Sequence, residues 1–202
     1  MSEKTTAVIG AGVMGETLLS GLLGSGHAVD RLIVVEKRAE RATELAQRYG
    51  VRVVDDLAQA AAADTLLLVV KPQDIGDVLA QMGTSLRSGQ LLISLAAGIT
   101  TGFIEERVPA GVAVVRVMPN TPALVRQGMS VISGGANCED RHLAEAEELM
   151  SCVGQAVRVP ESQQDAVTAI SGSGPAYLFL VVESMIEAGV HLGVPRAVAH
   201  EL

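Results

Sequence analysis

The chain has 202 residues, of which 49% are hydrophobic and 2% aromatic, and its formal net charge is −8. This length is sufficient for one complete domain and the beginning of a second, with a core built from Ala, Val, Leu and Ile. The negative charge and the lack of a basic cluster argue against nucleic acid and acidic membranes as partners. Small molecules and further copies of the same chain are the expected partners.

Targeting and membrane segments are not expected. Residues 1–4 lead directly into a predicted strand, without the regions of a signal peptide, which predicts a cytoplasmic protein. The longest uncharged stretch, residues 166–182, contains a Ser-Gly-Ser-Gly-Pro run, and we expect this run to interrupt the helix and so exclude a membrane span. Cys138 and Cys152 have no metal-ligand spacing, so reduced thiols and no metal site are expected.

Most of the chain alternates between short apolar runs and helix-length segments. Strands are predicted over residues 6–9, 32–35, 51–54, 65–70, 91–95, 112–117, 129–133 and 156–159. One of the intervening helices is polar, spans residues 39–49 and ends at Gly50. Because the apolar runs leave no face for water, the pattern predicts an α/β fold of the Rossmann type, a doubly wound, mostly parallel sheet with helices on both faces.

The last part of the chain changes to an all-helical pattern. Ser162 and Asp165 have the spacing of a capping box, which predicts the start of a helix. The run Ser171-Gly172-Ser173-Gly174-Pro175 predicts a tight turn into a long apolar helix, with Pro175 in its first turn. Pro195 is expected to open one more helix in the same way.

Two domains are predicted from this change of pattern. Residues 1–161 are expected to form a dinucleotide-binding domain, and residues 162–202 the beginning of a helical dimerisation and substrate domain. The last residues lie in a predicted helix without a cap or stop signal, which suggests a truncated chain.

A glycine motif between the first strand and the first helix predicts a dinucleotide site. Gly10 allows a tight turn, Gly12 lets the backbone approach a pyrophosphate, and Gly15 lets the helix pack closely on the sheet. The motif alone is weak evidence, but acidic Glu36 follows Gly15 by 21 residues at the end of the next strand, as a ribose contact does in such sites. An ordinary strand-to-helix turn is the alternative.

The residues after the second strand give opposite indications about the cofactor. Glu36 can accept hydrogen bonds from a ribose 2'-hydroxyl and repels a 2'-phosphate, whereas Lys37 and Arg38 can neutralise that phosphate. An outward Glu36 favours NADPH, and a Glu36 that points at the ribose favours NADH. An ordinary solvated loop is the third possibility.

Three loops follow the carboxyl ends of predicted strands, where ligands bind in this architecture: residues 70–73, 95–98 and 118–122. Lys71 is interpreted as a cofactor contact rather than a catalytic amine, with a solvated strand end as the alternative. Asn120, between two prolines, is either a functional amide or a structural cap of the loop.

No nucleophile triad is visible in the sequence, and its four histidines are scattered. Hydride transfer to a substrate that already carries positive charge fits this lack of an acid or base, because an iminium needs little proton assistance.

Five strings of residues, in order along nearly the whole chain, match one known family. They are Ile9-Gly10-Ala11-Gly12, Val70-Lys71-Pro72-Gln73, Ala96-Ala97-Gly98-Ile99-Thr100, Arg116-Val117-Met118-Pro119-Asn120-Thr121-Pro122-Ala123 and Thr168-Ala169-Ile170-Ser171-Gly172-Ser173-Gly174-Pro175-Ala176-Tyr177. On these residues the chain resembles the pyrroline-5-carboxylate reductases. The last two strings together are far more specific than the glycine motif.

The resemblance implies the NAD(P)H-dependent reduction of the cyclic imine 1-pyrroline-5-carboxylate to L-proline, the last step of proline synthesis. Either NADPH or NADH is expected as the cofactor, with NADPH slightly favoured, although Asp56 adds a second acid near the adenosine ribose. Asn120 and Ser173 are the candidate catalytic residues. The motif and the resemblance together predict cofactor contacts from Ile9, Gly10, Ala11, Gly12, Val13, Met14, Gly15, Glu36, Lys37, Arg38, Asp56, Val70, Lys71, Pro72, Ala96 and Ala97.

The resemblance also implies a homodimer or a larger homo-oligomer. Family members continue through further helices and a Ser-Pro-Gly-Gly-Thr-Thr substrate loop that this sequence does not contain. By analogy the active site forms between two subunits, so this polypeptide alone is expected to bind cofactor and turn over poorly. The alternatives are a related imine or β-hydroxyacid reductase and a non-catalytic nucleotide-binding module.

Overall fold

Eight strands form one sheet in the order β3-β2-β1-β4-β5-β6-β7-β8 in the computed structural model, which describes residues 4–202. The strands are β1 (Thr6–Ile9), β2 (Leu32–Val35), β3 (Arg52–Val54), β4 (Thr65–Leu68), β5 (Leu91–Ser94), β6 (Ala113–Met118), β7 (Gly128–Gly134) and β8 (Gly154–Arg158). The strands β1 to β6 are parallel, β7 is antiparallel to β6, and β8 is parallel to β7. The predicted mostly parallel sheet is confirmed.

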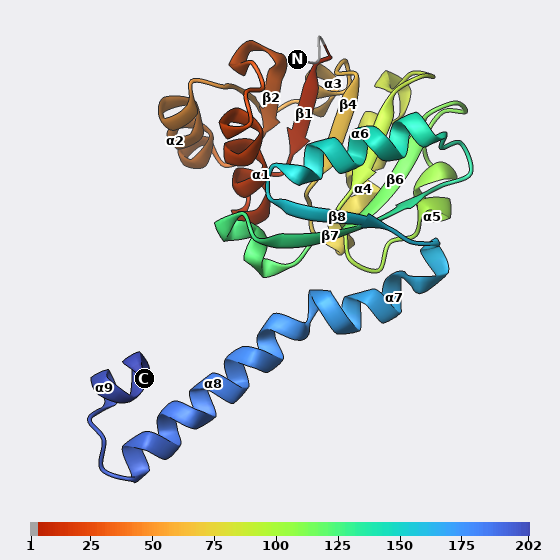
Figure 1. The fold of residues 1–202 in the computed structure, drawn as a ribbon. Helices are drawn as coiled ribbons and strands as arrows, with labels where there is room; N and C mark the ends of the chain where they lie inside the picture. The colour runs from red at the N-terminus through yellow and green to blue at the C-terminus, as the bar shows by residue number, and fades with distance from the viewer. Residues whose placement is uncertain (1–3) are drawn as a thin grey trace.

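Helices cover both faces of the sheet (Figure 1). The α-helices of this part are α1 (Val13–Gly24), α2 (Ala39–Tyr49), α3 (Leu57–Ala60), α4 (Ile75–Met82), α5 (Thr101–Glu105) and α6 (Asp140–Ser151). Short 3-10 helices connect them: η1 (Val29–Arg31), η2 (Pro72–Asp74), η3 (Gly83–Ser85), η4 (Thr121–Val125) and η5 (Glu161–Gln163). The helix α2 has the predicted bounds, and Gly50 ends it in the left-handed conformation with φ +67°.

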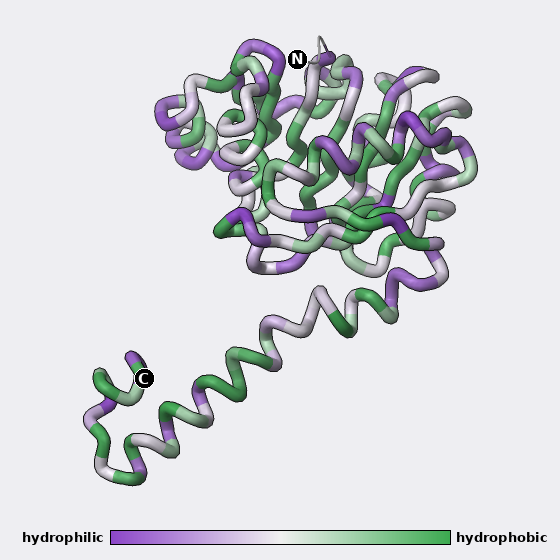
Figure 2. The backbone as a smooth tube through the Cα atoms, viewed as in Figure 1, coloured by the Kyte–Doolittle hydropathy of each residue, from purple (hydrophilic) through white to green (hydrophobic). Residues whose placement is uncertain are grey.

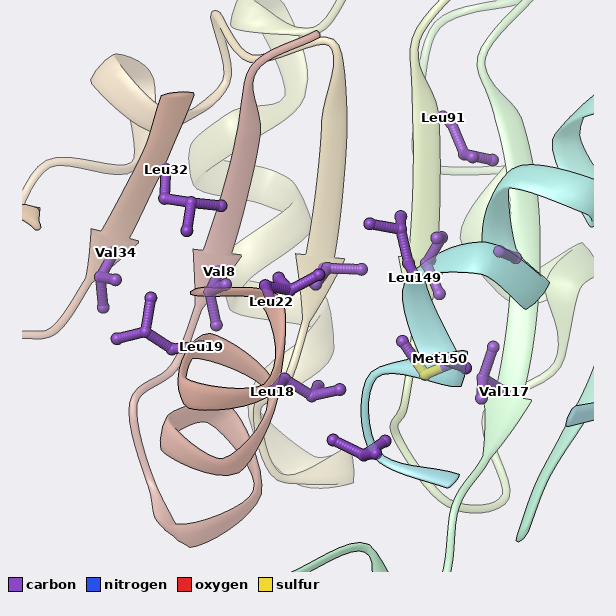
Figure 3. Close-up of a cluster of buried hydrophobic side chains, with 14 of the residues drawn as sticks. Val8, Leu18, Leu19, Leu22, Leu32, Val34, Leu91, Val117, Leu149 and Met150 are labelled. Atoms are coloured by element: carbon purple, nitrogen blue, oxygen red, sulfur yellow. The ribbon is translucent and has the colours of Figure 1, made fainter. Parts of the chain in front are cut away.

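The sheet separates two apolar clusters because successive strand residues point to opposite faces. Val8 of β1, Leu18 of α1 and Leu149 of α6 belong to one apolar cluster on one face, and Figure 3 shows side chains of this cluster on the strands and on both helices. On the other face, Ile9 packs with Ile75 at the start of α4. This two-sided core fixes the direction of each strand and therefore brings the strand ends together at one edge.

A helical arm follows the sheet and leads away from it (Figure 1). It consists of α7 (Gln164–Val167), a π-helical turn η6 (Thr168–Gly172), α8 (Gly174–His191) and α9 (Arg196–Glu201). The helix α8 has no buried residue, and Figure 2 shows hydrophobic residues in green along much of its length. Its exposed apolar side chains include Tyr177, Leu178, Phe179, Leu180, Val181, Val182 and Met185.

The predicted tight turn in the Ser-Gly-Ser-Gly-Pro run is wrong. The amide of Ser173 donates to the carbonyl of Thr168 at 2.8 Å, which is the i to i+5 bond of a π-turn, so the helix widens without ending. Pro175 lies in the first turn of α8 as predicted. The run therefore does not break the helical stretch Glu161–His191, which is long and apolar enough to cross a membrane by length and composition alone.

The predicted capping box at Ser162 and Asp165 is also wrong. The N-cap of η5 is Pro160, which has no side-chain acceptor, and the N-cap of α7 is Gln163, whose side chain makes no cap hydrogen bond. The Asp165 carboxylate instead accepts a hydrogen bond from Arg116 at 3.3 Å. Pro195 lies one residue before α9, at its N-cap, and not within its first turn.

Candidate active site

A cavity of about 380 Å³ lies at the sheet edge where β1 and β2 end. It is lined by Ile9, Gly10, Val35, Glu36, Lys37, Leu57, Val70, Asp74, Asp77, Val78 and Gln81. Ile9 and Val35 are neighbours at the carboxyl ends of their strands, so the cavity occupies the position where α/β sheets bind ligands.

The first and last glycines of the motif are required by the backbone around them. Gly10 has φ +96°, and a Cβ there would lie 2.5 Å from the carbonyl oxygen of Val69. A Cβ at Gly15 would collide with the carbonyl oxygen of Gly10. Both positions therefore exclude a side chain: Gly10 allows the loop after β4 to come close, and Gly15 allows α1 to approach the end of β1.

Gly12 is different, because space is open beside it. A Cβ at this position would meet no described atom within 4 Å, and the backbone angles of φ −67° and ψ −169° suit any residue. Gly12 is the N-cap of α1, where the first amides of the helix point outward and attract negative charge. The glycine therefore leaves room for a ligand and not for a neighbouring protein atom, which fits the pyrophosphate of a dinucleotide.

Glu36 is held at the end of β2 with only 8% of its surface exposed. Its Oε1 accepts hydrogen bonds from the backbone amide of Arg38 at 2.9 Å and from Arg38 Nε at 3.0 Å. Its Oε2 accepts from Arg38 Nη2 at 2.9 Å. The Arg38 hydrogen bonds hold the pKa of Glu36 below its ordinary value despite burial, so the carboxylate stays charged.

Of the cations near Glu36, Lys37 faces the cavity and Arg41 is paired with carboxylates. Lys37 lines the cavity with an exposed side chain. Arg41 on α2 pairs with Glu16 of α1 and, at 2.7 Å, with Glu44. Arg41 therefore ties α1 to α2 behind the glycine loop.

Asp56 acts as the N-cap of α3. Its Oδ1 accepts a hydrogen bond from the amide of Ala58 at 2.9 Å, and its neighbour Leu57 lines the cavity. The carboxylate therefore has a structural role close to the predicted ribose position.

The loops after β4 and β5 lie at the same edge of the sheet. Val70 lines the cavity, Lys71 is exposed, and Pro72 opens η2. Ala96 is buried, whereas Ala97 is exposed at the turn. Lys71 and Ala97 are therefore accessible to a ligand that extends along this edge.

Asn120 joins three segments through its side-chain amide. Its Nδ2 donates to the carbonyl of Ser171 at 3.1 Å, and its Oδ1 accepts from the amide of Met129 at 2.8 Å. The amide thus connects the loop after β6 with the start of β7 and with the π-turn of the arm. This geometry favours the structural interpretation that the sequence left open.

Ser173 lies directly after the π-turn and is half-buried. Within residues 4–202 its hydroxyl makes no hydrogen bond, so it is available to a ligand. The preceding Gly172 lies against Met118 at the end of β6, since a Cβ there would be 3.1 Å from Met118 Cε. The hydroxyl is therefore carried to the carboxyl edge of the sheet.

Comparison with known proteins places the chain among enzymes of one kind. A pyrroline-5-carboxylate reductase from Corynebacterium melassecola is 46% identical over 202 residues, covering 98% of this chain and 75% of the relative. The relative of the same name from Mycobacterium tuberculosis is 43% identical over 97% of this chain and 68% of its own length. The chain belongs to the pyrroline-5-carboxylate reductase family. The resemblance read from the sequence is thereby confirmed, and the chain is an oxidoreductase.

Family models and solved structures agree with this assignment. Residues 5–98 match the model described as NADP oxidoreductase, coenzyme F420-dependent, and residues 161–202 match pyrroline-5-carboxylate reductase dimerisation. The Coxiella burnetii pyrroline-5-carboxylate reductase has a TM-score of 0.92 at 33% identity, over 98% of this chain and 75% of that chain. The Plasmodium falciparum pyrroline carboxylate reductase, solved with NADP bound, has a TM-score of 0.87 at 30% identity, over 100% and 74% of the two chains.

Sequence reasoning missed several residues of this family member's site. Asp74, Asp77 and Gln81 line the cavity, and their helical spacing after Pro72 was a usable signal. The buried Arg116 of β6 was also missed, although a charge in the middle of an apolar strand was visible.

Arg116 holds the base of the arm. It lies 3.5 Å from Glu161 and 3.3 Å from Asp165. Glu161 also accepts hydrogen bonds from the amide of Thr101 at 2.8 Å and from its hydroxyl at 2.6 Å. These contacts fix the direction in which the arm of this reductase family member leaves the sheet.

Proposed function

We propose that this chain catalyses the reduction of 1-pyrroline-5-carboxylate to L-proline with a reduced nicotinamide dinucleotide. The observation that carries the proposal is the 46% identity, over nearly the whole chain, with a relative named for this activity. The open space at Gly12 and the cavity beside it support the cofactor half of the proposal.

The chemistry needs little from the protein beyond binding and orientation. Reduced nicotinamide, when bound, supplies a hydride. The protonated imine would accept this hydride at its imine carbon, which is C2 of the pyrroline and becomes C5 of proline, while the electron pair of the carbon–nitrogen double bond moves to nitrogen and completes the amine of proline. Because the iminium already carries the positive charge, no side chain has to transfer a proton during this step.

The chain's own residues divide into binding and positioning groups. Gly10, Gly12 and the N-terminus of α1 would hold the pyrophosphate of the cofactor, and Glu36 would contact its adenosine ribose. Asn120 is a positioning residue, because its amide is occupied in holding the loop after β6 against the arm. Ser173, whose hydroxyl lacks a partner among the described residues, is the candidate for a substrate hydrogen bond.

A second copy of the chain covers the apolar arm in this proposal. No residue of α8 is buried, and a long row of exposed apolar side chains is typical of protein interfaces. The match of residues 161–202 to a dimerisation model supports a copy of the same chain as the occupant. Contact with a lipid bilayer is the competing explanation, and sedimentation without detergent separates the two.

The activity is tested with this chain and with an extended form, to which the part of the Corynebacterium melassecola relative outside the matched 75% is joined. We expect imine-dependent oxidation of the nicotinamide in the extended form and a lower rate in the chain alone. Absence of turnover in both, with cofactor still bound, would support the nucleotide-binding module instead. Oxidation with a different imine or with a β-hydroxyacid product would support the related reductases.

A further inference from the structure

We infer that this chain takes NADH in preference to NADPH and that the Glu36 carboxylate sets the preference. The inference rests on the proposed function, because it specifies which nicotinamide cofactor that function uses. The expectation from the sequence slightly favoured NADPH, although Glu36 on one side and Lys37 and Arg38 on the other gave opposite indications. The side-chain contacts of these residues give the opposite indication.

The Glu36 carboxylate has a fixed position at the cavity. Glu36 lines the cavity at the end of β2, and its side chain is only 8% exposed, so it is fixed against the sheet edge and not turned into solvent. Three hydrogen bonds from Arg38 hold both of its oxygens in place. A carboxylate at this position accepts hydrogen bonds from the ribose hydroxyls of NADH.

The guanidinium groups of Arg38 and Arg41 are already paired with carboxylates. Arg38 makes a two-point contact with Glu36, which is the strongest geometry for such a pair. Arg41 is engaged with Glu16 and Glu44. To bind a 2'-phosphate, Arg38 must leave Glu36, which exposes a buried anion without a partner to a second anion.

The side chains that line the cavity are negatively charged overall. Three carboxylates line it, from Glu36, Asp74 and Asp77, against the single amine of Lys37, so the wall carries a net charge of −2. A 2'-phosphate adds nearly two negative charges to this surrounding, whereas a 2'-hydroxyl adds none. The cavity therefore accommodates the ribose of NADH and opposes that of NADPH.

The test is a pair of equilibrium binding titrations of this chain with NADH and with NADPH, which differ only in the 2'-phosphate. We expect NADH to bind at least about tenfold more tightly, the change that one charge-assisted hydrogen bond provides. Equal affinity, or tighter binding of NADPH, would overturn the inference.

Two variants and one control identify the residue responsible. Glu36→Gln keeps the shape but removes the charge and releases Arg38, so the ratio of affinities should move toward NADPH by about tenfold or more. Arg38→Met should weaken the binding of NADH and of NADPH to a similar degree. A loss of affinity for NADPH alone would contradict the inference. Glu40→Gln makes the same charge change on exposed α2, outside the cavity, and should leave the ratio unchanged.

These titrations separate the inference from the proposed function because binding needs no turnover. Tighter NADPH binding together with imine reduction overturns the preference and leaves the reductase. Tighter NADH binding without imine reduction by either the chain or its extended form supports the preference and overturns the reductase. Failure of both nucleotides to bind overturns both.

Discussion

One added methyl group should have different consequences at Gly12 and at Gly15, although both belong to the same motif. At Gly12 the new Cβ enters open space beside an allowed backbone conformation. At Gly15 it collides with the carbonyl oxygen of Gly10, where only a backbone shift can relieve the contact. Gly12→Ala should therefore fold normally and lose cofactor affinity, whereas Gly15→Ala should lose stability.

The magnitudes follow from these surroundings. For Gly12→Ala, restricting the unfolded chain gains about 0.4 to 1 kcal/mol, and the poorer N-cap loses a similar amount, so the melting temperature should stay within about 4 °C. For Gly15→Ala, overpacking costs about 1 to 3 kcal/mol, which lowers the melting temperature by about 2 to 12 °C.

The assay is thermal unfolding of each variant with and without NADH. At a concentration of one hundred times its dissociation constant, NADH stabilises the wild-type chain by about 2.7 kcal/mol. A tenfold loss of affinity in Gly12→Ala reduces this to about 1.4 kcal/mol at the same concentration. Full retention of the NADH-induced shift in Gly12→Ala would refute the assignment of the open space to the pyrophosphate, as would equal destabilisation of the two apo variants.

Three further predictions concern the arm and a half-buried thiol. Glu161→Gln should lower the unfolding free energy, measured by urea titration, by about 1 to 3 kcal/mol, because it removes the charge that pairs with buried Arg116. In the same titration Asp165→Asn should change this free energy by less than about 0.5 kcal/mol, because the Asp165 side chain is 93% exposed. Asn120→Asp places a carboxylate against a carbonyl, so kcat should fall about tenfold while the dissociation constant of NADH stays within about twofold; an unchanged kcat would contradict the positioning role. Burial raises the pKa of the Cys152 thiol to about 11. The folded chain therefore keeps this proton to a higher pH than the unfolded chain does. The stabilisation that results, about 2 to 3 kcal/mol, is fully present below a pH of about 9 and is lost as the pH rises to about 11. In urea titrations, the unfolding free energy of Cys152→Ser should fall less steeply with pH over that range than that of the wild-type chain. An equal fall in both would contradict this effect.

The sheet was predictable because its strands are continuous apolar runs bounded by clear stop signals. Every predicted strand formed within two residues of the expected bounds, and Gly50 ended α2 as expected. Parallel strands buried on both faces leave little choice of register or direction, so local pattern and tertiary structure agree.

The joint between the sheet and the arm was less predictable. Glycine and serine are ordinarily turn formers, which led to the expected break at Ser173. The helix continues because the wider π-turn satisfies the backbone of these residues, with Asn120 donating to one carbonyl. Such compensation comes from a partner 51 residues away and leaves no local signal.

The cofactor site was partly predictable. The roles of Gly10 and Gly15 follow from spacing alone, and the structure places both as expected. The direction of Glu36 did not follow from the sequence, because it depends on whether Arg38 folds back onto the carboxylate or extends into the cavity. All of the predicted cofactor contacts stay predictions.

The most direct test of the reductase proposal follows the hydride itself. NADH labelled with deuterium at the transferred position is incubated with 1-pyrroline-5-carboxylate and the extended form of the chain, and the product is analysed by mass spectrometry. Proline that carries one deuterium at ring carbon 5, formed in equal amount to the NADH oxidised, is the predicted result. Proline without the label, or NADH that binds and is never oxidised, would contradict the proposed function.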